Sequence, residues 1–384
     1  AFGVALPSVE WYDPETKLSK RSEGMTLYGR FVGERTWWYP TQQVERTGRY
    51  DEQGRQAGDW VEYHANGADK ARYTFVEGAM DGAYRAWHPN GERSVQGVYD
   101  AGRKTGVWEE WFAAGREMSR GTYEAGALVG EYLAWHENGQ VRERGRYDAG
   151  QREGVHEGYA PDGALILRAE YRGGRPVGTL EQWWPSGVRK HALPMDGGEA
   201  HGEERAWFAN GQLQYVKTWD RGRQHGDDLR FHDDGSQHMV SEYVEGRCKG
   251  VMRIWHRNGV LQGLATFDDG KKVGIARNWA DNGTLVYMCD VVADRDEGLY
   301  QTWFPGGGRK QYGTLSAAER DGAWFAWDEA GALVEDVSGV YVKGRRTGAL
   351  RDEDRNRAAA LHSDASPRRV ESAVVDPLTL FDER

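Results

Sequence analysis

Short runs of mixed aromatic, aliphatic and polar residues follow one another along most of this chain. Ala83–His88 and Arg93–Tyr99 are two such runs, with Asn90 and Gly91 between them. Both runs have the length of a β-strand and are bounded by turn residues. Asn-Gly favours a tight turn between antiparallel strands because both residues tolerate positive φ. The pair therefore predicts a β-hairpin.

This hairpin unit recurs at a constant step of 24 residues, which identifies a repeat array. Places within a copy are counted from its opening glycine; a second glycine stands nine places later, and the sixth place is always aromatic. The opening glycines are Gly58, Gly82, Gly106, Gly130, Gly154, Gly178, Gly202, Gly226, Gly250, Gly274, Gly298 and Gly322.

The repeat predicts an all-β fold: an elongated array of about 13 β-hairpin repeats that pair into a long, twisted antiparallel meander. Helical repeats are disfavoured because each copy contains at least two glycines and no apolar stripe at helical spacing.

Two registers are open inside each hairpin. A two-residue loop sets place three opposite place sixteen, which pairs Tyr84 with Gly97 and lays an aromatic ring over a strand glycine. A three-residue loop sets the sixth-place ring opposite place twelve, as Trp135 opposite Val141. A slip of one residue exchanges the faces of the sheet, so only one register holds unless a bulge intervenes. We favour the pairing of aromatic rings with glycines.

Three segments are expected: a degenerate cap repeat at residues 1–32, the array at 33–348, and a charged tail at 349–384. Arg351–Arg357 and the alanines that follow predict a short charged helix. Leu378, Leu380 and Phe381 near the end of the tail are candidate docking residues, either on the last hairpin or on a partner.

The unit G-x-[WY]-x-x-[WY]-[HF]-x-N-G, followed by G-x-Y-x-x-G, resembles the MORN-repeat variant. Bacterial proteins of the YwqK type, described as antitoxins, are built from that repeat. The copy at Gly130–Gly150 fits the pattern best, and the resemblance covers about residues 33–348. It implies an elongated sheet of hairpins that binds proteins or self-associates. Three copies depart from the pattern at the third place, where His156, Glu204 and Asp228 replace the aromatic residue.

Composition narrows the classes of partner. The 384 residues carry a net charge of −10, and the pI is near 5.7. An acidic chain is a poor partner for nucleic acid or anionic lipid, so we expect no nucleic acid and do not expect a membrane. Two cysteines at non-equivalent places favour a reducing compartment, and we expect the cytoplasm. The start at Ala1 without methionine leaves secretion or a periplasmic location open.

The sixth-place aromatic column is the candidate binding site. It is either core, covering strand glycines, or an exposed platform for a sugar or for another protein. The tryptophans concerned are Trp87, Trp111, Trp135, Trp183, Trp207, Trp255, Trp279 and Trp303.

Five histidines share the seventh place, but equivalent places in neighbouring copies lie two strands, or roughly 9.6 Å, apart. A zinc ion needs ligands at about 2 Å, so neighbouring copies cannot share one. The sequence predicts no metal site, no cofactor and no catalytic residues. The histidines are His64, His88, His136, His232 and His256.

These observations predict a non-enzymatic scaffold that binds a protein partner, with an antitoxin-like or immunity-like role implied by the resemblance. The first alternative is a module that binds carbohydrate or a membrane surface through exposed aromatic rings. A second is an accessory module for a separate catalytic chain. Pairing of two copies through a free sheet edge, to give a homodimer, is a further possibility.

The predicted array can be tested by its length in solution. About 26 strands at ~4.8 Å give a sheet roughly 125 Å long, which corresponds to a radius of gyration of at least about 36 Å. A compact chain of this length would give roughly 21 Å. Small-angle X-ray scattering of the monomer distinguishes the two, and a value near the lower figure would contradict an open array.

Overall fold

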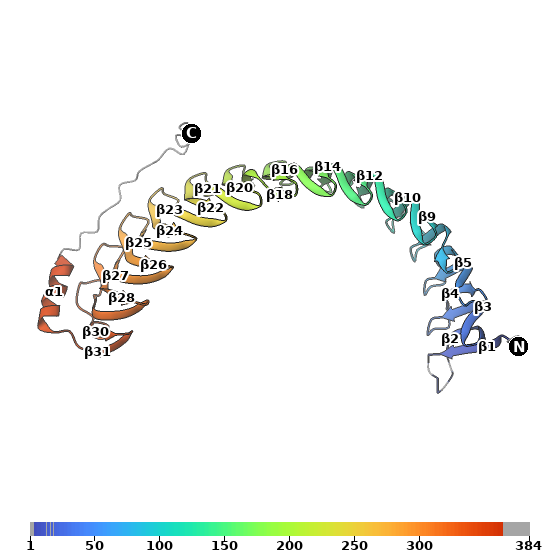
Figure 1. The fold of residues 1–384 in the computed structure, drawn as a ribbon, viewed down its shortest axis with the longest axis horizontal. Helices are drawn as coiled ribbons and strands as arrows, with labels where there is room; N and C mark the ends of the chain where they lie inside the picture. Colours follow the sequence, from blue (N-terminus) through green and yellow to red (C-terminus); the bar gives the residue numbers. More distant parts are fainter. Residues whose placement is uncertain (1–3, 13, 16, 18, 364–384) are drawn as a thin grey trace. The chain divides into compact units, whose positions relative to one another are not determined.

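The computed structural model describes residues 4–12, 14–15, 17 and 19–363, which form 31 strands and one helix. They fall into two compact units, unit one ending at Gly187 and unit two beginning at Val188. Within each unit, the strands that follow one another in sequence pair antiparallel (Figure 1). The predicted all-β class and the antiparallel meander of hairpins are confirmed.

Unit one contains β1 (Leu6–Trp11), β2 (Lys20–Leu27), β3 (Arg30–Trp38), β4 (Val44–Tyr50), β5 (Gln56–Tyr63), β6 (Asp69–Val76), β7 (Ala79–Met80), β8 (Gly82–Trp87), β9 (Arg93–Asp100), β10 (Arg103–Trp111), β11 (Glu117–Glu124), β12 (Ala127–Trp135), β13 (Val141–Asp148), β14 (Gln151–Tyr159), β15 (Leu165–Arg172) and β16 (Arg175–Trp183).

Unit two contains β17 (Arg189–Asp196), β18 (Glu199–Ala200), β19 (Gly202–Trp207), β20 (Leu213–Asp220), β21 (Arg223–Phe231), β22 (Gln237–Val244), β23 (Arg247–Trp255), β24 (Leu261–Asp268), β25 (Lys271–Trp279), β26 (Leu285–Val292), β27 (Arg295–Trp303), β28 (Arg309–Ser316), β29 (Glu319–Ala326), β30 (Gly339–Val342), β31 (Arg345–Gly348) and α1 (Asp352–Ser363).

Both registers considered for the hairpin occur together. Tyr84 lies opposite Gly97, as favoured from the sequence. Trp135 lies opposite Val141, as in the other register. A β-bulge between places five and six makes this possible, because it inserts one residue between the two pairings.

The loop at the Asn-Gly end differs from the two-residue turn that the sequence suggested. The amide of Gly91 donates to the carbonyl of His88 at 2.9 Å, and only the glycine of the Asn-Gly pair has positive φ, at 87°. The loop is therefore a type I turn closed by a glycine in the left-handed region. The two-residue turn stands at the other end of the hairpin, where Ala101 (φ 45°) and Gly102 (φ 83°) are both left-handed.

The opening glycine of each copy is required by a second bulge. Thr105 pairs with Val98 and Glu109 with Gln96, so Gly106–Trp108 lie opposite Gly97 alone. Gly106 has a φ of 64°, a conformation that L side chains adopt at a cost of roughly 1–2 kcal/mol. This bulge aims the third-place ring at the preceding copy.

The ring covers a glycine of the preceding copy, not the glycine opposite it in its own hairpin. A Cβ built on Gly97 would lie inside the indole of Trp108, and one built on Gly48 inside the indole of Trp60. Trp60 is 1% and Trp108 is 4% exposed. Each ring thus joins two copies, which corrects the assignment made from register alone.

The sheet has two faces of different character. The ring face carries places three, five, fourteen, sixteen and eighteen, which form the buried cluster around Trp60 and Phe75 in unit one and that around Cys289 and Trp324 in unit two. The reverse face carries places two, four, six, twelve and fifteen. There Trp279, Leu285 and Trp303 form a smaller cluster.

Helix α1 covers the reverse face of the last copy. It contains most of the segment after Arg351 that the sequence predicts to be helical. Phe325, Trp327 and Leu350 form a buried cluster with Ala358 of the helix. Arg309 Nε on β28 donates to the carbonyl of Leu361 at 3.1 Å.

Substitution of a covered glycine tests the ring packing. Gly97→Ala places a methyl group inside the Trp108 ring, so we expect a loss of about 1–3 kcal/mol in the free energy of unfolding. Gly306→Ala is the matched control, because a Cβ there meets nothing within 4 Å and the φ is not left-handed. Urea denaturation measures both, and equal losses would contradict the packing.

Candidate functional site

The sixth-place tryptophans are divided between core and surface. Trp279 and Trp303 are 6% and 7% exposed and belong to the reverse-face cluster. The other predicted members are partly exposed: Trp87, Trp111, Trp135, Trp183, Trp207 and Trp255. Arginines lie over some of them, such as Arg93 at 5.0 Å from the ring of Trp111. The role of the column in binding stays a prediction.

The seventh-place histidines bond to the neighbouring copy. His88 Nε2 donates to the carbonyl of Trp111 at 2.8 Å, and His64, His136, His232 and His256 make the equivalent bond. Asparagines of the Asn-Gly turn add a second ladder, as in Asn90 Nδ2 to the carbonyl of Ala113 at 2.7 Å. Within the residues that the structure describes, no group of three His, Cys, Asp or Glu side chains is placed to hold a metal ion.

A column that the sequence analysis missed lies at the second place of unit two. Val251, Ile275 and Leu299 are 38%, 41% and 37% exposed in three successive copies of the reverse face. The same face of the next copy is covered by α1. The sequence does contain a signal for this column, because an apolar residue recurs there every 24 positions. The candidate docking residues Leu378, Leu380 and Phe381 lie outside the described residues.

The three copies with His156, Glu204 or Asp228 at the third place behave in two ways. His156 keeps the packing, because its ring covers Gly145 and its Nε2 bonds the carbonyl of Arg146 at 2.8 Å. Trp108 makes the equivalent bond to Val98. Glu204 and Asp228 do not replace a ring, yet they are 7% and 0% exposed. Two carboxylates are thus buried on the ring face of unit two.

Glu204 is held by three hydrogen bonds: from His191 Nε2 at 2.7 Å, from Tyr215 Oη at 2.8 Å and from Trp219 Nε1 at 2.7 Å. Burial alone would raise the pKa of this carboxyl, but the three bonds outweigh it and lower the pKa to about 2. Glu204 is therefore charged at neutral pH.

Asp228 is held by Arg230, whose Nε and Nη2 donate to its two oxygens at 3.0 and 2.9 Å, and by Gln224 at 3.1 Å. This bond to Asp228 raises the pKa of Arg230. A bidentate pair fixes the guanidinium plane. Lys217 lies opposite Asp228 in the register, at a place that is glycine in several other copies.

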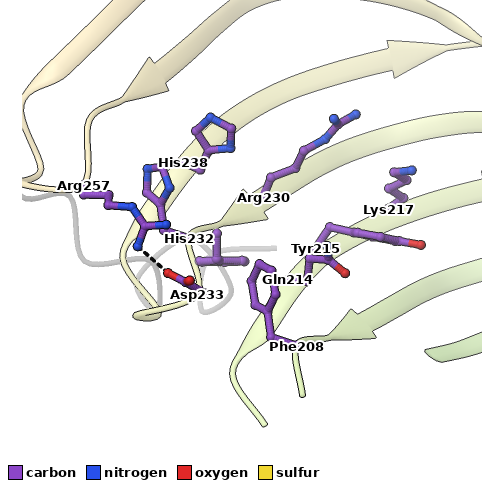
Figure 2. Close-up of a pocket in the computed structure, with 10 residues that line it drawn as sticks. Phe208, Gln214, Tyr215, Lys217, Arg230, His232, Asp233, His238 and Arg257 are labelled. Atoms are coloured by element: carbon purple, nitrogen blue, oxygen red, sulfur yellow. Dashed lines mark hydrogen bonds and ion pairs between the residues drawn. The ribbon is translucent and has the colours of Figure 1, made fainter. Parts of the chain in front are cut away.

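A cavity of about 440 Å³ lies beside these carboxylates (Figure 2). Its walls come from β20, β21, β22 and the adjoining loops, and one end is closed by the ion pair of Arg257 with Asp233. Six of the ten lining side chains carry nitrogen donors, whereas Asp233 alone carries a carboxylate. The lining residues are Phe208, Gln214, Tyr215, Lys217, Arg230, Phe231, His232, Asp233, His238 and Arg257.

The two histidines of this cavity contact each other, with ring centroids 4.5 Å apart. Burial lowers the pKa of His238, and the neighbouring His232 and Arg230 lower it further. The sequence placed His232 in the seventh-place column but gave no reason to join it to His238, Lys217 and Arg230.

The two cysteines have no nucleophile arrangement. Both are buried, and burial raises the pKa of Cys248 and raises that of Cys289 to about 11. Their thiols are therefore protonated at neutral pH and unreactive. No helix among the described residues is long and apolar enough to cross a membrane.

A family model described as the MORN repeat variant matches residues 128–149 and 200–220. One match falls on the copy opened by Gly130 and the other on the copy opened by Gly202, which contains Glu204. The resemblance seen in the sequence is confirmed in these two copies, and the chain carries MORN-variant repeats.

No curated protein matches the sequence. The solved structures with matches include crystal structures of TcdB2-TccC3 and TcdB2-TccC3-TEV and a Photorhabdus luminescens Tc holotoxin pore. Each is 10% identical with a TM-score of 0.16; the alignments cover 85%, 90% and 86% of this chain and 20%, 23% and 22% of theirs. The chain spans about a fifth of their length. A likeness at this level carries no conclusion about fold or function.

Buried Glu204 predicts a specific loss of stability in acid. Its folded pKa of about 2 lies below the ordinary glutamate value of 4.5, so its contribution is present above about pH 4.5 and is lost as pH falls towards 2. Glu204→Gln should cost about 1–3 kcal/mol at neutral pH and progressively less below pH 4.5.

Glu203→Gln is the control, since Glu203 is partly exposed and pairs with the exposed Arg205. Thermal unfolding between pH 2 and 7 gives the comparison. The same pH profile for both variants would show that Glu204 is not held as described.

Proposed function

Since the chain carries MORN-variant repeats, which generally mediate protein interactions, we propose that it is a non-enzymatic scaffold for a protein partner. The partner lies on the reverse face of unit two, along β23, β25 and β27. The observation that carries this proposal is the exposed column of Val251, Ile275 and Leu299 beside a helix already packed on the same face.

Helix α1 is an internal example of such packing. It lies on Phe325 and Tyr312 of the reverse face and buries Ala358 against them. Its His362 ring stacks on Trp327 at 6.2 Å, and Arg355 pairs with Glu335 at 3.0 Å. The reverse face therefore accepts a peptide segment through apolar contacts flanked by ion pairs.

The uncovered column continues this surface to neighbouring copies. Equivalent places are two strands apart, so Val251, Ile275 and Leu299 form a line roughly 19 Å long. Beside it, at the fourth place, stand Arg253 and Arg277, neither of which has an ion pair within the described residues. An apolar line flanked by unpaired arginines favours a partner segment in which acidic residues alternate with apolar ones.

The alternative of a sugar-binding platform has less support. It needs open ring faces in the sixth-place column, but Trp279 and Trp303 are buried. Arg189 lies over Trp207 at 5.6 Å, as Arg93 does over Trp111. An antitoxin-like role would be one instance of protein binding, and its support is the family resemblance.

The proposal is tested by substituting residues of the column and measuring the affinity for a partner captured beforehand. Ile275→Asp with Leu299→Asp should weaken binding at least about tenfold, because two apolar contacts are replaced by carboxylates. Val155→Asp is the matched control: the same place and face, 42% exposed, but in unit one. Affinity is measured with the purified partner after its capture from native extract.

Two results would contradict the proposal. Unchanged affinity in the double variant would remove the column from the interface. A shift to monomer in sedimentation, with no partner lost, would show that the column joins two copies of this chain. A partner that binds only after removal of residues 364–384 would support the surface and identify those residues as its competitor.

A further inference from the structure

The cavity beside Asp228 lies on the ring face, apart from the reverse-face column, and the scaffold function does not use it. It occurs where the repeat pattern fails at several places at once. In the copy opened by Gly226, the third place carries Asp228 and the fifth Arg230. Lys217 occupies the sixteenth place of the preceding copy. A ring over a glycine fills the corresponding space in other copies, such as Trp108 over Gly97.

The donors around the cavity exceed the acceptors. Arg230 spends Nε and Nη2 on Asp228, which leaves its Nη1 available. Lys217 has no ion pair within the described part of the chain; its ammonium lies 4.3 Å from the ring centroid of Tyr215. No hydrogen bond of the described residues occupies the ring nitrogens of His238. Three donors of different type therefore line one cavity, and each keeps a donor group that no hydrogen bond among the described residues occupies.

The charges indicate a monoanion. Arg257 is offset by Asp233 and Asp234 at the loop edge, and Arg230 is offset by Asp228. Glu204 already has three donors of its own. Lys217 makes no ion pair among the described residues, and the nearest opposite charge that acts on it is that of Glu204. A monoanion is repelled less by the buried carboxylates of Glu204 and Asp228 than a phosphate dianion would be.

We propose that this cavity binds a carboxylate group between Lys217, Arg230 and His238. The planar carboxylate matches the fixed guanidinium of Arg230, and the rings of Phe208 and Tyr215 accommodate the carbon skeleton that carries it. The source is either a small carboxylic acid or an acidic side chain of a bound protein, and the two are separated by experiment.

Binding is coupled to protonation of His238. This imidazole is faced by Arg230 and His232, with Lys217, Arg257 and Asp233 in the same lining. Cations oppose its protonation, and a bound carboxylate reverses part of that effect. Affinity therefore rises as pH falls, and the pKa of His238 rises when the site is filled.

The experiment follows the imidazole resonances of the full chain, labelled with ¹³C at histidine Cε1. Propionate, N-acetyl-glutamyl-amide and inorganic phosphate are added separately up to about 50 mM, at ionic strength held constant with sodium chloride, which detects dissociation constants of about 10 mM and below. Saturable shifts of His238 with either carboxylate, about threefold tighter at pH 6 than at pH 8, are expected.

Lys217→Met removes the unpaired charge and keeps an apolar stem, so carboxylate affinity should fall about fivefold or more. Lys310→Met removes a lysine charge outside the cavity and should leave affinity within about twofold. An unchanged resonance of His256, which lies in unit two and bonds the carbonyl of Trp279, confirms that both variants fold. His238→Gln should abolish the pH dependence without abolishing binding.

Tighter binding of the glutamyl amide than of propionate identifies an acidic side chain as the source, and equal binding identifies a small carboxylic acid. Shifts that do not saturate, or that occur equally in Lys217→Met, would overturn the site. Tighter binding of phosphate than of both carboxylates would overturn the assignment of the ligand.

Discussion

The structure depends on the contact between a third-place ring and a strand glycine of the preceding copy. A single-layer sheet has no second layer of secondary structure to bury its apolar residues. Trp60 and Trp108 instead lie flat on Gly48 and Gly97, where any side chain would lift them away. Because each ring joins two copies, stability passes from neighbour to neighbour along the sheet, as in other repeat proteins.

Polar side chains perform the equivalent task at the loop edge. The seventh-place histidines and the turn asparagines each bond a carbonyl of the next copy, so loops of adjacent hairpins are tied together. These bonds satisfy backbone groups that the ladder leaves open beside the bulge. The recurrence of histidine at the seventh place therefore has a structural explanation.

Two third places in unit two carry a carboxylate, and they show what replaces a ring when the contact between ring and glycine is lost. Glu204 and Asp228 are buried charges, and each survives only because several donors surround it. Apolar residues at these places would be simpler to stabilise. The arrangement keeps donors in a cavity on the ring face, while the reverse face carries the apolar column and α1. The two proposed binding sites thus lie on opposite faces of the sheet in unit two.

The sequence by itself determined the period, the hairpin unit, the antiparallel class and the pairing of Tyr84 with Gly97. These follow from local properties: glycine and asparagine at turns, and strand length between them. It also indicated α1, because charged residues followed by alanines favour a helix wherever they stand.

Only the tertiary structure decided which glycine each ring covers, since a strand glycine borders two strands and the bulge at Gly106 turns the ring towards the preceding one. It also decided which sixth-place tryptophans are buried, because α1 and the neighbouring copies cover Trp327 and Trp303 but leave Trp111 partly open. The cavity joins Lys217, Arg230 and His238 from three strands. Their proximity arises from lateral pairing, which no spacing along a single strand reveals.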